Sequence, residues 1–217
     1  MDFPAPSRTL TWRSRSVEQD GTSSSFITAG RGGGEGAFSF ANAIDDTQTV
    51  IAWARDPQNA KKYRIDARRI VLIGHSMGGF MAAAAGRNPK VVGIGMIAAW
   101  NIGANAKHVS PAGLKDSLQG SIRPLSGCTV DGLVTEMIAH KDEWDYIGFV
   151  PQLKDRPVLV VSADDKTLRS NEAFVTSMKS AGATRITSVH LPTDHLFNDH
   201  RIALQIAVLD WLNTLNP

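Results

Sequence analysis

A serine inside a glycine-flanked turn is the residue of this chain best suited to do chemistry. Ser76 is the centre of Gly74–Gly78 (GHSMG), a G-x-S-x-G pattern between an apolar run and a helix-forming run. A serine hydroxyl is a weak nucleophile, so it must be presented to a base without steric cover. A sharp strand-to-helix turn presents it in this way, and the glycines leave room for the crowded backbone. We expect Ser76 to act as a nucleophile and the Met77 N–H to face the oxyanion that its attack creates.

The elements that must hold this turn are indicated by hydrophobic pattern. Four short apolar runs are typical of buried strands: Ile70–Ile73, Val91–Ala98, Val158–Val161 and Ile186–Leu191. Helix-forming stretches separate most of them, at about Gly78–Gly86, Asn171–Ser180 and His200–Leu215. This alternation predicts an α/β fold with a mostly parallel sheet and helices on both faces. We expect Ser76 to lie at the carboxyl end of a central strand of that sheet.

Composition also suggests how the chain is organised. Residues 1–37 form a Gly- and Ser-rich segment that we expect to be irregular, and residues 38–217 form the core. The core begins with a helical stripe in FSFANAIDDTQTVIAWARD, which ends at Asp56 because proline follows. Residues 103–153 interrupt the strand–helix rhythm with prolines and glycines and a helix-like piece, Leu133–Trp144. We interpret them as a lid-like insertion over one end of the sheet.

The residues around Ser76 also carry a family resemblance. The stretch FSFANAIDD, followed by AWARDPQNAKKYRIDARRIVLIGHSMGGFMA, resembles the α/β-hydrolase superfamily, and within it the branch of bacterial esterases and prolyl-oligopeptidase-related enzymes. The resemblance covers about residues 30–217. It implies an α/β-hydrolase-type fold and a serine hydrolase that works through an acyl-enzyme, without a cofactor or a metal ion.

The resemblance further implies an acid that follows the nucleophile along the chain, after a late strand. Residues 157–161 are that strand, and two adjacent carboxylates, Asp164 and Asp165, follow it. Asp165 fits the family position better, because the apolar Leu168 stands where the next helix opens. Asp164 remains the alternative.

The base is expected in the loop between the last strand and the C-terminal helix, where His195 stands. His200, at the start of the final helix, and His190, within the strand, are the alternatives. The resemblance therefore implies a Ser76–Asp165–His195 triad. In it, His195 takes the serine proton, and the aspartate fixes the imidazole tautomer and stabilises the imidazolium.

One family element is not found in the sequence. The second oxyanion donor usually comes from a loop with the pattern HGG or HGGG, whereas Gly30–Gly34 lies too close to Ser76 and resembles a later turn. We therefore expect the N-terminal strands of the family to be missing or replaced. An open sheet edge would then allow a homodimer. A missing donor lowers the rate by about 10²–10³, so a catalytically weak hydrolase-fold remnant is an alternative.

Composition and charge argue against several other classes of protein. The 23 basic and 21 acidic residues leave a formal net charge of +2, which favours neither nucleic acid nor an anionic membrane. No stretch approaches the roughly 18 apolar residues of a membrane span, and no secretory signal is visible. Cys128 is the sole cysteine, and no Cys/His spacing is typical of a metal site. We expect a cytoplasmic enzyme without metal or cofactor.

These observations lead to one main functional prediction. The chain is expected to be a carboxylesterase-type serine hydrolase that cleaves small carboxylic esters. A triad of this kind also cleaves amides, so a prolyl-oligopeptidase-like peptidase is the second reading, although no repeats of an accompanying β-propeller are present. The identity of the substrate and its acyl group stays open, because both depend on how residues 103–153 pack.

Overall fold

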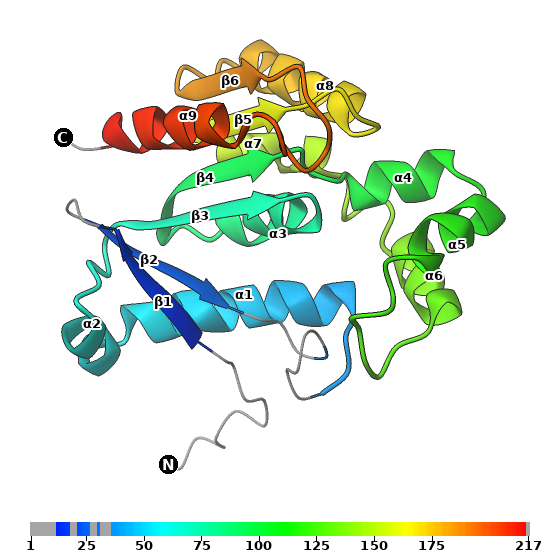
Figure 1. Ribbon diagram of the computed structural model, residues 1–217, viewed down its shortest axis with the longest axis horizontal. Helices are drawn as coiled ribbons and strands as arrows, with labels where there is room; N and C mark the ends of the chain where they lie inside the picture. The colour runs from blue at the N-terminus through cyan, green and yellow to red at the C-terminus, as the bar shows by residue number, and fades with distance from the viewer. Residues whose placement is uncertain (1–11, 18–20, 27–29, 31–35, 216–217) are drawn as a thin grey trace. The chain divides into compact units, whose positions relative to one another are not determined.

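Figure 1 shows the computed structural model of the chain, which describes residues 12–17, 21–26, 30 and 36–215. The chain divides into two compact units. The first comprises Met1–Ala67 and Val109–Ala139, and the second comprises Arg68–His108 and His140–Pro217. The expected boundary near residue 37 and the lid role of residues 103–153 stay predictions.

The second unit is built on a four-stranded parallel sheet. Its order is β3 (Ile70–His75), β4 (Val91–Ile97), β5 (Val158–Ser162) and β6 (Ile186–His190). The four apolar runs are therefore strands, and the predicted α/β class is confirmed. One detail is wrong: among the described residues β3 is an edge strand, not a central one, because it pairs with β4 alone. An edge position for the strand before Ser76 agrees with the expected loss or replacement of the N-terminal strands.

Helices cover both faces of this sheet. The helices of this unit are α3 (Met77–Gly86), α4 (Ile102–His108), η1 (Tyr146–Phe149), α7 (Val150–Leu153), α8 (Leu168–Ser180) and α9 (Arg201–Asn213), of which α3, α8 and α9 lie against the strands. On one face, Leu159 and Val161 of β5 pack in the same buried cluster as Trp211 of α9. Alternate residues of a strand point to opposite faces, so Val158 and Val160 point to the other face. There α3 lies against β3 and β4, and α8 lies against β5 and β6.

The first unit contains a hairpin and four helices among its described residues. β1 (Trp12–Val17) pairs antiparallel with β2 (Gly21–Phe26), with Trp12 opposite Phe26. The helices are α1 (Phe40–Arg55), α2 (Pro57–Tyr63), α5 (Pro111–Gln119) and α6 (Val130–Ala139). The hairpin lies in the segment expected to be irregular. The helix-like piece predicted at Leu133–Trp144 begins and ends earlier, as α6, because a turn follows Ala139.

The N-terminus of α1 is capped from within its own sequence and from α6. The Ser39 hydroxyl accepts a hydrogen bond from the Asn42 N–H at 3.0 Å. The two carboxylate oxygens of Glu136 accept from the N–H groups of Phe40 and Ala41, both at 3.0 Å. A carboxylate at this end of a helix satisfies free donors and complements the helix dipole. Glu136 therefore joins α6 to α1 within the first unit.

Replacing Glu136 by alanine should destabilise this junction. We expect Glu136→Ala to lower the free energy of unfolding by about 1–2 kcal/mol, measured by urea denaturation. Glu172→Ala is the control, because Glu172 is exposed on α8 and has no hydrogen bond or ion pair among the described residues. Equal stability of the two variants would contradict the role given to the Glu136 carboxylate.

None of the helices in the described part of the chain combines the length and the apolar character needed to cross a membrane.

Candidate active site

Ser76 lies in a strained turn between β3 and α3. Its backbone has φ 56° and ψ −118°, a conformation that costs a non-glycine residue about 1–3 kcal/mol. Backbone hydrogen bonds hold it there. The Ser76 N–H donates to the Ile97 carbonyl at 2.8 Å, and the Ser76 carbonyl accepts from the N–H groups of Trp100 and Gly79, both at 3.0 Å. The end of β4 and the first turn of α3 thus fix the serine in the turn that the sequence predicted.

Two glycines allow α3 to approach β3 and the segment that follows β4. A Cβ atom added at Gly74 would lie 2.0 Å from the Gly78 carbonyl oxygen, which is far closer than atoms can approach. A Cβ atom added at Gly79 would lie 2.7 Å from the Cβ of Ala99. At Gly78, in contrast, no atom lies within 4 Å of the added Cβ. The turn therefore requires glycine at 74 for lack of space, but not at 78.

This difference gives a matched pair of variants. We expect Gly74→Ala to lower the free energy of unfolding by about 2–3 kcal/mol, because backbone atoms must move apart. Gly78→Ala should leave it unchanged or raise it by up to about 1 kcal/mol, since alanine is the better helix former. Guanidinium denaturation of both variants measures the difference. Equal destabilisation of the two variants would show that lack of space for a Cβ atom is not the reason for glycine at position 74.

Ser76, His195 and Asp165 form a continuous hydrogen-bonded chain within the second unit. His195 Nε2 lies 3.0 Å from Ser76 Oγ, and His195 Nδ1 lies 2.5 Å from Asp165 Oδ2. Asp165 follows β5, and His195 lies in the loop between β6 and α9. The three residues expected from the sequence are thus brought together, although 119 positions separate Ser76 from His195.

Asp165 is held by a second residue besides His195. Its Oδ1 accepts hydrogen bonds from the Thr167 N–H and the Thr167 hydroxyl, both at 2.7 Å. Burial alone would raise the pKa of Asp165, but the hydrogen bonds from Thr167 and His195 outweigh it, and the pKa is lowered. The side chain is 8% exposed. Asp165 is therefore an ionised, oriented partner for His195.

The alternative acid and one alternative base face each other instead of Ser76. Asp164 Oδ1 lies 3.1 Å from His190 Nε2, and His190 Nδ1 lies 3.2 Å from the Ser162 hydroxyl. Ser162 is buried, whereas Asp164 is mostly exposed. This second Ser–His–Asp arrangement has a nucleophile that substrate cannot reach. Substitutions at Ser162 and Asp164 are therefore controls for substitutions at Ser76 and Asp165.

The loop that carries His195 has hydrogen bonds of its own. The Asp194 carboxylate accepts from the N–H of Leu196 at 3.0 Å and from the Asn198 side chain at 3.0 Å. The Thr193 hydroxyl donates to Asp199, and this bond, together with the contact to His200, lowers the pKa of Asp199 to about 2. No motif in the sequence indicates a role for these polar residues. Each hydrogen bond joins residues two to six positions apart, close to His195. Polar side chains at such short spacing are typical of a loop held by local hydrogen bonds.

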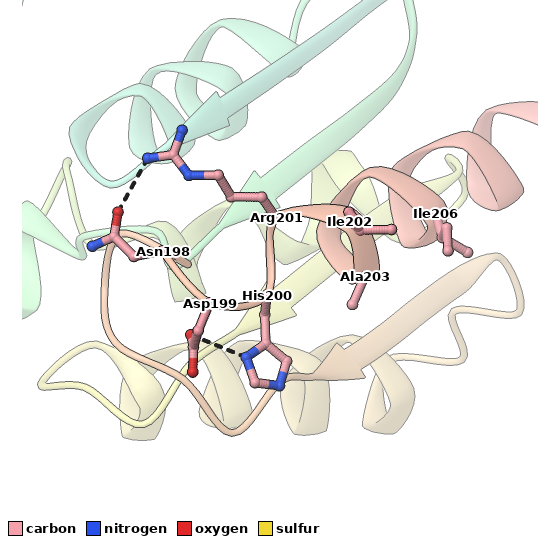
Figure 2. Close-up of a pocket in the computed structure, with 7 residues that line it drawn as sticks. All are labelled: Asn198, Asp199, His200, Arg201, Ile202, Ala203 and Ile206. Carbon is pink, nitrogen blue, oxygen red and sulfur yellow. Dashed lines mark hydrogen bonds and ion pairs between the residues drawn. The ribbon is translucent and has the colours of Figure 1, made fainter.

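The other alternative base, His200, lies beside a shallow cavity rather than in the hydrogen-bonded chain. The cavity has a volume of about 540 Å³ and is lined by Asn198–Ala203 and Ile206. Figure 2 shows that its polar groups pair with one another: Arg201 donates to Asn198 Oδ1 at 3.1 Å, and His200 Nδ1 lies 3.0 Å from Asp199. None of the three residues of the hydrogen-bonded chain lines this cavity.

The start of α3 offers a donor for a developing negative charge. Within α3, the first N–H that donates to a preceding carbonyl is that of Gly79, which donates to the Ser76 carbonyl. The Met77 N–H therefore precedes the hydrogen-bond ladder of α3, as the first N–H groups of any helix do. The positive end of the helix dipole also favours an anion at this position. In the described part of the chain, no group of three or more His, Cys, Asp or Glu side chains is arranged to hold a metal ion.

Comparisons with known proteins agree with this fold. The BD-FAE family model matches residues 35–96, which include α1, β3 and the Ser76 turn. A thermophilic esterase from Thermogutta terrifontis superposes with a TM-score of 0.64 at 13% identity, covering 99% of this chain and 97% of that one. The chain has the α/β-hydrolase fold. The superfamily resemblance expected from the GHSMGG segment is thereby confirmed.

Other α/β-hydrolase structures are similar to the chain. An enol-lactonase from Burkholderia xenovorans has a TM-score of 0.63 at 14% identity, covering 96% of this chain and 98% of that one. An acylaminoacyl peptidase from Pyrococcus horikoshii has a TM-score of 0.58 at 13% identity, covering 79% of this chain and 27% of that one. No curated protein sequence matches the chain.

Proposed function

We propose that this α/β-hydrolase is a serine esterase that cleaves small carboxylic esters through Ser76, His195 and Asp165. The observation that carries the proposal is the hydrogen-bonded chain from Asp165 through His195 to Ser76 Oγ, with spacings of 2.5 and 3.0 Å. Similarity to an esterase and an enol-lactonase supports ester substrates. A cytoplasmic location and a homodimer through a sheet edge stay predictions of the sequence.

Acylation follows from the positions of these groups. Ser76 Oγ attacks the ester carbonyl carbon while His195 Nε2 takes the hydroxyl proton. The carbonyl oxygen becomes an oxyanion, which the Met77 N–H stabilises. The bond to the leaving alkoxide then breaks, and His195 returns the proton to it, so an alcohol leaves and an acyl-Ser76 remains.

Deacylation repeats these steps with water. His195 Nε2 removes a proton from a water molecule while the water oxygen attacks the acyl carbon. The proton then passes from His195 to Ser76 Oγ as the bond between the acyl group and the serine breaks. The products are a carboxylic acid and the free serine. Asp165 stays ionised throughout and stabilises the imidazolium that forms twice in each cycle.

A covalent probe tests the nucleophile directly. A fluorophosphonate should label the wild-type chain, and mass spectrometry of a proteolytic digest should find the adduct on the peptide that contains Ser76. Ser162 is the internal comparison, because it also lies beside a histidine but is buried. An adduct on Ser162, or no adduct, would contradict the proposal.

A peptidase is the second candidate, and similarity to an acylaminoacyl peptidase favours it. An ester and an amide pass through the same tetrahedral oxyanion, so the triad alone does not separate them. Turnover of p-nitrophenyl acetate should be compared with turnover of an aminoacyl-p-nitroanilide. Faster turnover of the ester, relative to the uncatalysed reaction of each substrate, supports the esterase, and the reverse order supports the peptidase.

A further inference from the structure

A second histidine lies against the first. His75, the last residue of β3, has its Nε2 atom 2.7 Å from the backbone carbonyl oxygen of His195. The two imidazole rings have centroids 4.7 Å apart and are tilted by 45°. The ring of Phe197 meets His75 edge-on, with centroids 6.1 Å apart. His75 therefore contacts the loop of His195 through a hydrogen bond and through its ring.

The chemistry of this contact fixes the role of each atom. A carbonyl oxygen only accepts, so His75 Nε2 carries the proton and donates it. Loss of surrounding water lowers the pKa of His75, and the bond to the carbonyl opposes this in part. A neutral ring with its proton on Nε2 satisfies both conditions. The Ser76 hydroxyl lies against His195 Nε2, and among the described residues no hydrogen bond joins it to His75, so His75 is not the base for Ser76.

The strained turn explains how adjacent residues reach the same loop. Neighbouring side chains on a regular strand point to opposite faces, so His75 and Ser76 would normally diverge. The positive φ of Ser76 turns its hydroxyl instead toward His195. His195 is thus held by two successive residues of the β3–α3 turn. His75 holds its backbone, and Ser76 meets its ring.

We propose that His75 is a positioning residue that ties the His195 backbone to the strand carrying the nucleophile. This inference rests on the proposed esterase function. His195 lies in the loop between β6 and α9, and a small displacement of this base from the nucleophile would cost much of the rate. With His75 in place, movement of the His195 backbone away from Ser76 must break a 2.7 Å hydrogen bond.

Two substitutions separate the hydrogen bond from the ring contact. His75→Phe keeps a flat ring but has no donor, whereas His75→Gln places an amide nitrogen near the position of Nε2 and loses the ring. We expect His75→Phe to lower kcat for p-nitrophenyl acetate about tenfold, with KM within about twofold. His75→Gln should recover most of kcat. Denaturation curves establish that both variants fold.

A proton NMR measurement gives a readout besides turnover. The proton between Asp165 and His195 Nδ1 should give a downfield resonance in the wild type. It should shift or broaden in His75→Phe and persist in His75→Gln. Unchanged kcat and an unchanged resonance in His75→Phe would overturn the inference, and so would equal losses in both folded variants.

The two failures are distinguishable. If Ser76→Ala hydrolyses the ester as fast as the wild type, the proposed function fails, whatever His75 does. If Ser76→Ala is inactive and His75→Phe retains full kcat and the same resonance, the esterase stands and the positioning role of His75 fails.

Discussion

Ser76→Ala is expected to reduce the rate of p-nitrophenyl acetate hydrolysis by at least about 10³-fold. The change removes the Oγ atom that His195 Nε2 approaches at 3.0 Å, so no acyl-enzyme can form. A hydrogen replaces the hydroxyl at a partly exposed position, so we expect stability to change little. Initial rates measured over a range of enzyme concentrations give the comparison.

Ser162→Ala is the matched control for this prediction. Ser162 also hydrogen-bonds to a histidine with an aspartate behind it, but the serine is buried at the end of β5. We expect its hydrolysis rate to stay within about threefold of the wild type. If Ser76→Ala retained the wild-type rate, the chain would be the catalytically weak or non-catalytic hydrolase-fold remnant that the sequence also allowed.

The strands of the second unit could be predicted from the sequence, because the hydrophobic pattern that indicates each strand lies within the strand itself. Val158–Val161 is apolar at every position, which is typical of a strand buried on both faces, and it is β5. The turn at Ser76 follows for the same reason, since the crowding that requires Gly74 arises between residues four positions apart. The hairpin β1–β2 was missed. Its strands, WRSRSV and GTSSSF, carry no apolar alternation to indicate them.

Long-range contacts explain what the sequence did not reveal. The Glu136 carboxylate caps a helix that begins 96 positions earlier, and His75 donates to a carbonyl 120 positions later. Neither pairing can be deduced from the sequence, because the two partners of each hydrogen bond lie on elements far apart along the chain. Asp165 and Asp164 are adjacent, and only the family order favoured one of them. Thr167 was the local signal, because an aspartate commonly accepts hydrogen bonds from the residue two positions on.

Substitution of these two aspartates should give the second large difference in kcat. We expect Asp165→Asn to lower kcat for p-nitrophenyl acetate by about 10³–10⁴, and Asp164→Asn to change it by less than about threefold. Both substitutions remove one negative charge at neighbouring positions with little change in volume. Asp165 faces His195 Nδ1, whereas Asp164 faces His190. Steady-state kinetics at neutral pH measures the difference.

Contacts with Thr167 explain why Asp165→Asn should lower kcat. Its N–H and hydroxyl both donate to Asp165 Oδ1, so an asparagine at 165 must place its amide oxygen there. The amide NH₂ then faces His195 Nδ1 and donates to it. His195 is thereby held in the tautomer with its proton on Nε2, which cannot accept the proton of Ser76. Equal rates for the two aspartate variants would remove Asp165 from the proposed mechanism.

The pH dependence of stability follows from the lowered pKa of Asp165. The folded chain binds a proton at this carboxylate less readily than the unfolded chain does, so the group stabilises the fold above its unfolded pKa of about 3.9. That contribution is lost as the pH falls through the lower, folded pKa. Asp165→Asn should therefore be less stable than the wild type at pH 7, and the difference should shrink below about pH 4. Urea denaturation at several pH values measures it, and a difference that grew in acid would contradict the assignment of Thr167 and His195 as the groups that lower the pKa.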